Sequence, residues 1–140
     1  MRVCISSGHG KHVSGAVGIL NEVEEARRVV PEVVKYLRQA GAEVIEFHEN
    51  ETRNRDANVN AIVAFHNSQQ RDLDVSVHFN AVEGGIREGG IGVETLYFKG
   101  NAQTQAIASK VSDFLKVRMP VNEIEKPSSI AFIARSRPPV

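Results

Sequence analysis

Short strand-type runs and helical runs alternate along this chain, and this order constrains its fold more than any other feature of the sequence. Strands are expected at residues 2–6, 42–47, 73–79, 93–98 and 130–134, and helices at 21–39, 57–67 and 102–117. Strands that are separated by helices form largely parallel sheets with helices on their faces. The sequence therefore predicts an α/β fold with a mostly parallel (mixed) twisted sheet of about five to six strands flanked by helices.

The loops beyond the carboxyl ends of the first and third strands are the expected place for a site, because open α/β sheets bind ligands there. His9 lies in a Gly-rich loop directly after the first strand. In the third strand, apolar residues alternate with polar ones, and His78 lies near its end on the polar side. Both histidines are therefore candidate site residues.

The helix expected at 21–39 carries a carboxylate on its apolar stripe. Asn21 is placed to cap this helix and Gly41 to end it, while Pro31 predicts a kink or a break into two pieces. On a helical wheel, Glu22 lies on the same side as the apolar residues Ala26, Val29, Val30, Val33 and Leu37. Burying an ionised carboxylate is costly without a partner, so a cation beside Glu22 is expected.

Two imidazoles and one carboxylate from three separate elements match a catalytic zinc site with an open position for water or substrate. Each residue also has a structural interpretation: His9 as a loop histidine, Glu22 as a helix-start carboxylate that interacts with the helix dipole, and His78 as a core histidine. The remaining histidines, His12, His48 and His66, are expected at the surface or at an edge of the fold.

Composition excludes several other classes. The chain has 140 residues, with 17 Lys and Arg against 17 Asp and Glu, which predicts a single domain over 1–140 and disfavours a dedicated nucleic-acid binder. No run reaches the roughly 20 apolar residues of a membrane span, so no membrane insertion is expected.

The first apolar run is shorter than a signal-peptide core, so synthesis in the cytoplasm without a signal peptide is expected. Cys4, the single cysteine, is expected to fill the core.

Three segments resemble the zinc-dependent N-acetylmuramoyl-L-alanine amidases, the cell-wall hydrolases of bacteria and their phages. Residues 7–11 read SGHGK, like the first zinc motif of that family, and Glu22 falls where the family places its glutamate ligand. Residues 75–81 read VSVHFNA, like the family's Ser-x-His-x-Asn-Ala segment, and residues 92–98 read GVETLYF, like its next strand. The likeness runs from about residue 1 to residue 134.

The resemblance implies a mixed six-stranded sheet and one Zn²⁺ held by His9, Glu22 and His78. It also implies hydrolysis of the amide between N-acetylmuramic acid and L-alanine in peptidoglycan, as in autolysins and phage endolysins. The general-base glutamate of the family is expected beyond Val140, and neither Glu123 nor Glu125 is assigned that role. A catalytically inactive, zinc-containing module that binds muropeptide and a non-metal interaction domain remain as alternatives.

Further expectations follow for partners and location. The substrate is peptidoglycan or muropeptide, reached on the outer face of the cell after lysis-dependent release. A missing last strand would leave an open sheet edge, through which self-association is possible. The loop at 83–92 has five glycines in ten residues and is expected to border the site and to move.

Overall fold

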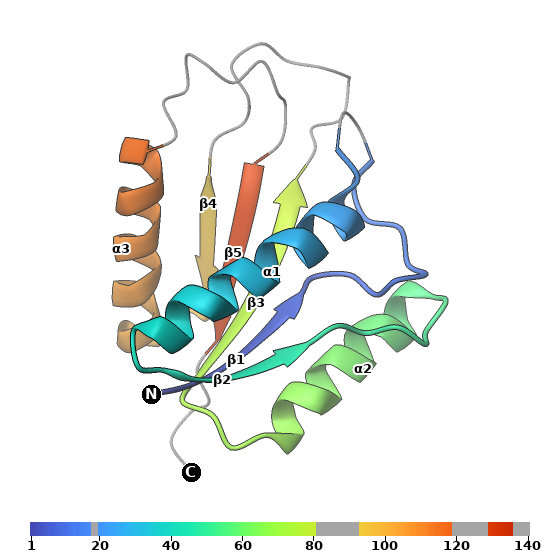
Figure 1. Cartoon of the computed structure of the whole chain (residues 1–140), viewed down its shortest axis with the longest axis horizontal. Helices are drawn as coiled ribbons and strands as arrows, with labels where there is room; N and C mark the ends of the chain where they lie inside the picture. The colour runs from blue at the N-terminus through green and yellow to red at the C-terminus, as the bar shows by residue number, and fades with distance from the viewer. Residues whose placement is uncertain (18–19, 81–92, 119–128, 136–140) are drawn as a thin grey trace.

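The structure, a computed structural model, describes residues 1–17, 20–80, 93–118 and 129–135 (Figure 1). The first half of the chain contains β1 (Arg2–Ser7), α1 (Glu22–Gln39), β2 (Glu43–Phe47), α2 (Arg55–Ser68) and β3 (Leu73–Asn80). The second half adds β4 (Glu94–Tyr97), α3 (Ala102–Arg118) and β5 (Ser129–Arg135). The predicted order of strands and helices is confirmed, and the fold is α/β.

The described strands form one five-stranded sheet in the order β2-β1-β3-β5-β4. β1 runs parallel to both β2 and β3, whereas β5 is antiparallel to β3 and pairs in parallel with β4. The sheet is therefore mixed. Strands β2, β1 and β3 run parallel to one another, so their carboxyl ends share one edge.

Helix α1 is amphipathic, and its start is fixed by a side-chain cap. The Asn21 carboxamide oxygen accepts hydrogen bonds from the amides of Val23, at 3.0 Å, and Glu24. Of the predicted stripe, Ala26 and Val30 are buried against the sheet, and the other three residues are partly buried beside them. Val34, which the predicted stripe did not include, is also buried. Of the kink or break expected at Pro31, the break is wrong, because α1 continues as one helix through this exposed residue.

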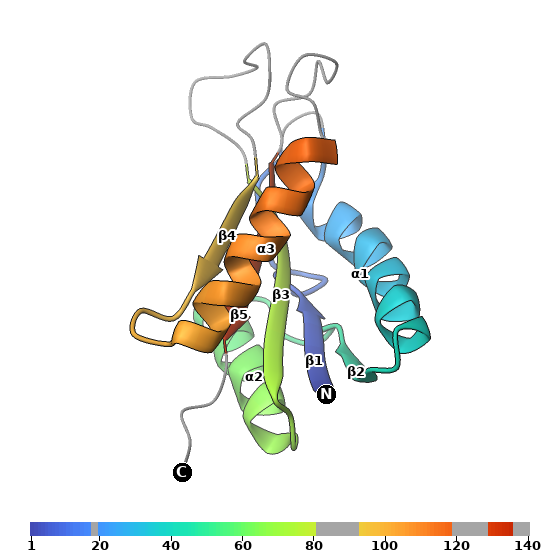
Figure 2. The ribbon, with the colours of Figure 1, turned by 90° about the vertical axis from the view of Figure 1, so that its left-hand side faces the viewer.

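The two faces of the parallel strands have different roles. Val77 and Phe79 of β3 are buried in the core beneath α1. The alternate residues of the same strand, Asp74, Ser76 and His78, line a cavity on the opposite face together with residues of α2. Figure 2 shows α1 and α2 on opposite sides of these strands. Period-two alternation along β3 therefore separates the core from the candidate site.

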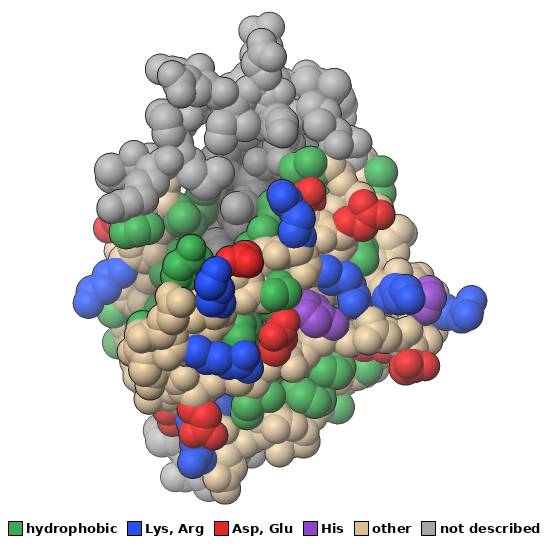
Figure 3. Space-filling view, in the orientation of Figure 1, with side chains coloured by type: hydrophobic (Ala, Val, Ile, Leu, Met, Phe, Trp, Pro, Cys, Tyr) green, Lys and Arg blue, Asp and Glu red, His purple; other side chains and the backbone are tan. Residues whose placement is uncertain are grey.

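Cys4 is fully buried and has a free thiol, as expected for a core residue. Basic and acidic side chains are intermixed on the face that α1 covers (Figure 3). In the described part of the chain, no helix is both long enough and apolar enough to cross a membrane.

Candidate metal centre

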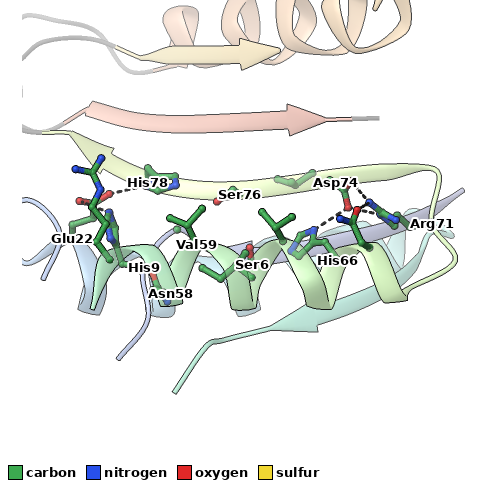
Figure 4. A pocket seen from close by; sticks show the side chains of 16 residues that line it. Ser6, His9, Glu22, Asn58, Val59, His66, Arg71, Asp74, Ser76 and His78 are labelled. Carbon is green, nitrogen blue, oxygen red and sulfur yellow. Dashed lines mark hydrogen bonds and ion pairs between the residues drawn. The ribbon is translucent and has the colours of Figure 1, made fainter. Parts of the chain in front are cut away.

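Three side chains that are distant in the sequence meet at the edge where β1 and β3 end (Figure 4). His9 comes from the loop after β1, Glu22 is the first residue of α1, and His78 lies near the end of β3. One potential ligand atom from each residue lies within 4.8 Å of the other two. The structure thus brings together the three residues that the sequence singled out.

The Glu22 carboxylate lies between the two imidazoles. Its Oε2 is 3.3 Å from Nε2 of His9, and its Oε1 is 3.0 Å from Nδ1 of His78. The two rings meet edge to face, with their centroids 5.1 Å apart. The His9 and His78 side chains remain 23% and 21% exposed, so the cluster can be approached from solvent.

Glu22 is a buried carboxylate held in its ionised form. Burial by itself would raise the pKa of Glu22, but hydrogen bonds with His78, with His9 and with the Ala16 amide hold this pKa well below its ordinary value. The Ala16 amide donates to Oε2 at 2.6 Å, and the Phe79 amide donates to Oε1 at 3.1 Å. The centre therefore contains a fixed negative charge at neutral pH.

These donors fit zinc. Two imidazole nitrogens and one carboxylate oxygen form a common three-residue ligand set for catalytic zinc, which keeps its fourth position for water or substrate. Calcium or magnesium would favour oxygen ligands throughout. The buried Glu22 carboxylate would also stabilise a divalent cation beside it, because buried charges are commonly paired or bound to metals.

Gly8 lets the backbone of the His9 loop approach the third candidate ligand closely. A Cβ at this position would lie 2.0 Å from Cε1 of His78. The Gly8 amide also donates to the Val77 carbonyl at 2.8 Å, which ties the loop to β3. The small residue before His9 is therefore a steric requirement of the centre.

A cavity of about 460 Å³ extends from the candidate ligands along β3 toward its other end. Ser6 and Ser76 line its middle, and Val59 of α2 borders it (Figure 4). His66 and Asp74 lie at the far end. The cavity thus connects the candidate metal centre to a second polar cluster.

This second cluster contains Cys4, His66 and Asp74, whose potential ligand atoms also lie within 4.8 Å of one another. The Asp74 carboxylate is already paired with Arg71. Nε and one terminal nitrogen of Arg71 lie 2.7 and 2.9 Å from the two oxygens of Asp74. Burial raises the pKa of the Cys4 thiol to about 11, so this thiol is protonated at neutral pH. Because the Arg71 guanidinium would repel a second cation, the cluster is an ion-pair network.

The expected surface or edge position is wrong for His66. This residue is 7% exposed, because α2 turns it toward β3, where its Nδ1 lies 2.9 Å from Oδ1 of Asp74. His12 is exposed, as expected. His48 is partly exposed, and its Nδ1 and Nε2 lie 2.9 Å from Ser7 Oγ and 3.0 Å from Glu46 Oε1.

Glu49 and Asn58 are buried residues next to the site that the sequence analysis missed. They are 4% and 1% exposed, and they lie against the loop that carries His9. A carboxylate after a strand and an asparagine in the first turn of a helix are common in loops and caps, so no sequence signal marked them. The expected loop at 83–92 and the residues Glu123 and Glu125 lie outside the described part of the chain.

Comparison with known proteins agrees with this geometry. A family model described as N-acetylmuramoyl-L-alanine amidase matches residues 3–139. An uncharacterized protein of Clostridium perfringens is 27% identical over 117 residues, which cover 82% of this chain but only 34% of that protein. The family match includes all three residues of the candidate metal centre. The chain belongs to the N-acetylmuramoyl-L-alanine amidase family.

Proposed function

We propose that this chain is a zinc-dependent amidase domain that hydrolyses the amide bond between N-acetylmuramic acid and L-alanine in peptidoglycan. His9, Glu22 and His78 are its zinc ligands in this proposal. The observation that carries it is the meeting of these three side chains within 4.8 Å at the strand edge of a chain from the amidase family.

Each ligand has a distinct role. When bound, zinc would polarise the substrate carbonyl and lower the pKa of a water molecule. Glu22 supplies the balancing negative charge, and the amides of Ala16 and Phe79 fix the direction of its carboxylate. His9 and His78 supply imidazole nitrogen donors, and their side chains remain partly open to solvent. Hydrogen bonds to a metal ligand, like those from the two amides to Glu22, orient that ligand and increase metal affinity.

Proton transfer needs a further carboxylate. Among the described residues that line the cavity, the carboxylates are Glu22 and Asp74. Glu22 belongs to the ligand set, and Asp74 is paired with Arg71 and His66. We therefore propose that the general base comes from outside the described residues.

The same observation favours a second candidate, a zinc-containing module that binds muropeptide without cleaving it. In this function the three ligands would hold zinc, and zinc would supply an open position for a carbonyl or carboxylate of the muropeptide. Both candidates require zinc, and they differ only in turnover.

The experiment measures three quantities on the same protein: zinc content, binding of a soluble muropeptide, and release of alanine amino termini from purified peptidoglycan. We compare the unmodified chain with His78→Ala and with His12→Ala, a histidine control at an exposed position. The amidase proposal predicts zinc-dependent release of alanine that His78→Ala abolishes and His12→Ala retains. Because the general base is expected beyond Val140, binding without alanine release supports the second candidate when it persists in a chain extended past that residue. Unchanged zinc content in His78→Ala contradicts the ligand assignment.

A further inference from the structure

The loop that carries His9 is supported from behind by a buried polar pair. Glu49 follows β2, and Asn58 lies in the first turn of α2. They are 4% and 1% exposed, which is unusual for a carboxylate and a carboxamide. Neither residue is among the proposed zinc ligands, so their burial needs another explanation.

A chain of hydrogen bonds connects this pair to the loop. The Gly10 amide donates to Oδ1 of Asn58 at 3.2 Å, and Nδ2 of Asn58 donates to Oε2 of Glu49 at 2.9 Å. An ionised carboxylate can only accept hydrogen bonds, so Asn58 must turn its NH₂ group toward Glu49 and its oxygen toward Gly10. Glu49 thereby fixes the orientation of Asn58.

Glu49 is itself firmly held. Its Oε1 accepts hydrogen bonds from the amides of Glu51 and Thr52 at 2.7 and 2.9 Å, and the Thr52 hydroxyl donates to Oε2. Burial by itself would raise the pKa of Glu49, but the hydrogen bonds from Thr52, Glu51 and Asn58 lower it to about 2. The carboxylate is therefore an acceptor throughout the neutral pH range.

The loop meets this pair at two successive residues directly after His9. Besides the Gly10 contact, the Lys11 amide donates to the backbone carbonyl of Glu49 at 2.9 Å. The approach is close, since a Cβ on Gly10 would lie 2.2 Å from Glu49 Oε2 and 2.4 Å from Asn58 Nδ2. Arg27 of α1 donates to the same Glu49 carbonyl, so the helix that presents Glu22 is tied to the same point.

We propose that Glu49 and Asn58 are positioning residues that hold the loop 8–11 so that His9 reaches Glu22 and His78. They act through the loop backbone and do not take part in the chemistry. This inference rests on the proposed function, because it treats His9 as a zinc ligand.

The test uses Asn58→Ala, which removes the acceptor for the Gly10 amide, and Glu49→Gln, which sets two NH₂ groups against each other. Substitutions behind metal ligands typically weaken metal binding about 10–100-fold, and we expect both variants to lose zinc affinity within that range. We also expect the absorption spectrum of the cobalt(II)-substituted protein to change, because the position of the His9 nitrogen changes.

A double variant separates positioning from general damage. Asn58→Asp alone sets two carboxylates against each other, whereas Glu49→Gln with Asn58→Asp restores one donor and one acceptor between the two side chains. The double variant should therefore recover zinc affinity and the cobalt spectrum relative to either single variant. This comparison remains valid even if Asn58→Ala does not fold.

Thr104→Ala is the matched control, since Thr104 is a fully buried polar residue on α3, away from the metal centre. It should lower stability and leave zinc affinity unchanged. Unchanged zinc affinity in folded Glu49→Gln, or no recovery in the double variant, would overturn the positioning role.

A metal-free measurement distinguishes this inference from the proposed function. Hydrogen exchange of the Gly10 amide should be slow in the unmodified chain and faster in Asn58→Ala, with or without zinc. If the unmodified chain binds no zinc, the proposed function fails, but this exchange result still reports whether the pair holds the loop. Equal exchange rates of the Gly10 amide in the unmodified chain and in Asn58→Ala would contradict the positioning role, whether or not the chain binds zinc.

Discussion

At the scale of single residues, the centre depends on how closely the backbone packs against a ligand ring. Gly8→Ala would place a Cβ 2.0 Å from the His78 imidazole, so the ring or the loop must move. We expect zinc affinity to fall at least about tenfold, in line with other changes that displace a ligand. Competition with a chelator measures this change. Ser14→Ala, in an exposed part of the same loop, is the control and should bind zinc normally.

The sequence predicts individual site residues when their local pattern fixes their direction. Glu22 was found because the helical wheel places it on the apolar stripe of α1, and the structure buries it to 5% exposure. His66 was missed because its burial depends on Asp74, a partner on another element. A helical pattern shows which residues share a face, but it does not show what that face meets.

At the scale of elements, α1 contains an internal proline that the sequence predicted would disturb it. The helix continues through Pro31, which is exposed and lacks the amide that would bond to the Arg27 carbonyl. Pro31→Ala should therefore raise the free energy of unfolding by about 1–3 kcal/mol, because proline is about 3 kcal/mol less favourable than alanine inside a helix. Urea unfolding measures the difference, and a loss of stability would contradict this account of α1.

At the far end of the cavity, Asp74 of β3 is paired with Arg71, which lies in the connection between α2 and β3. The Asp74 and Arg71 side chains are 15% and 5% exposed, and the His66 ring also contacts Asp74. Asp74→Asn leaves the buried Arg71 without its counter-charge, which should cost about 3 kcal/mol at neutral pH.

The stabilisation of the fold by the Asp74–Arg71 ion pair depends on pH in a defined direction. Burial would raise the pKa of Asp74, but the hydrogen bonds from His66 and Arg71 lower it below the ordinary 3.8. The unfolded chain therefore binds this proton more readily than the folded one, so the stabilisation is complete above about pH 4 and is lost as the pH falls further. The stability difference between the unmodified chain and Asp74→Asn should narrow below that pH. A difference that stays constant down to acid unfolding would contradict this interpretation.

Elements differ in how well the sequence defines them. Helix α1 was predicted together with part of its buried face: Ala26 and Val30 lie on the predicted apolar stripe, whereas the buried Val34 was not included in it. Helix α2 was predicted as a helix, but its packing was not, because Val59 and Val63 remain 50% and 41% exposed while His66 and Asn58 are buried. Polar burial of this kind depends on partners in other segments, and periodicity contains no information about those partners.

At the scale of the whole molecule, the apolar core and the candidate metal centre occupy different places. The described core clusters join β1, β3, β2 and α1 through apolar side chains such as Ile5, Val30 and Val77. The candidate ligands lie at the strand edge, where Glu22 is held by the Ala16 and Phe79 amides as well as by the two histidines. The core should therefore form without metal, unlike that of small domains that fold only around zinc.

Metal removal tests this separation. A chelator should leave helix content and cooperative unfolding in place while it removes zinc. Zinc stabilises the folded state only through its binding there, so free zinc at about 100 times its dissociation constant should raise the free energy of unfolding by about 2.7 kcal/mol. His12→Ala should retain this increase and His78→Ala should lose it, although both variants remain folded without metal. Unfolding of the unmodified chain on chelation would contradict this separation. It would show that the packing beneath α1 and the amide contacts of Glu22 do not hold the strand edge together without the metal.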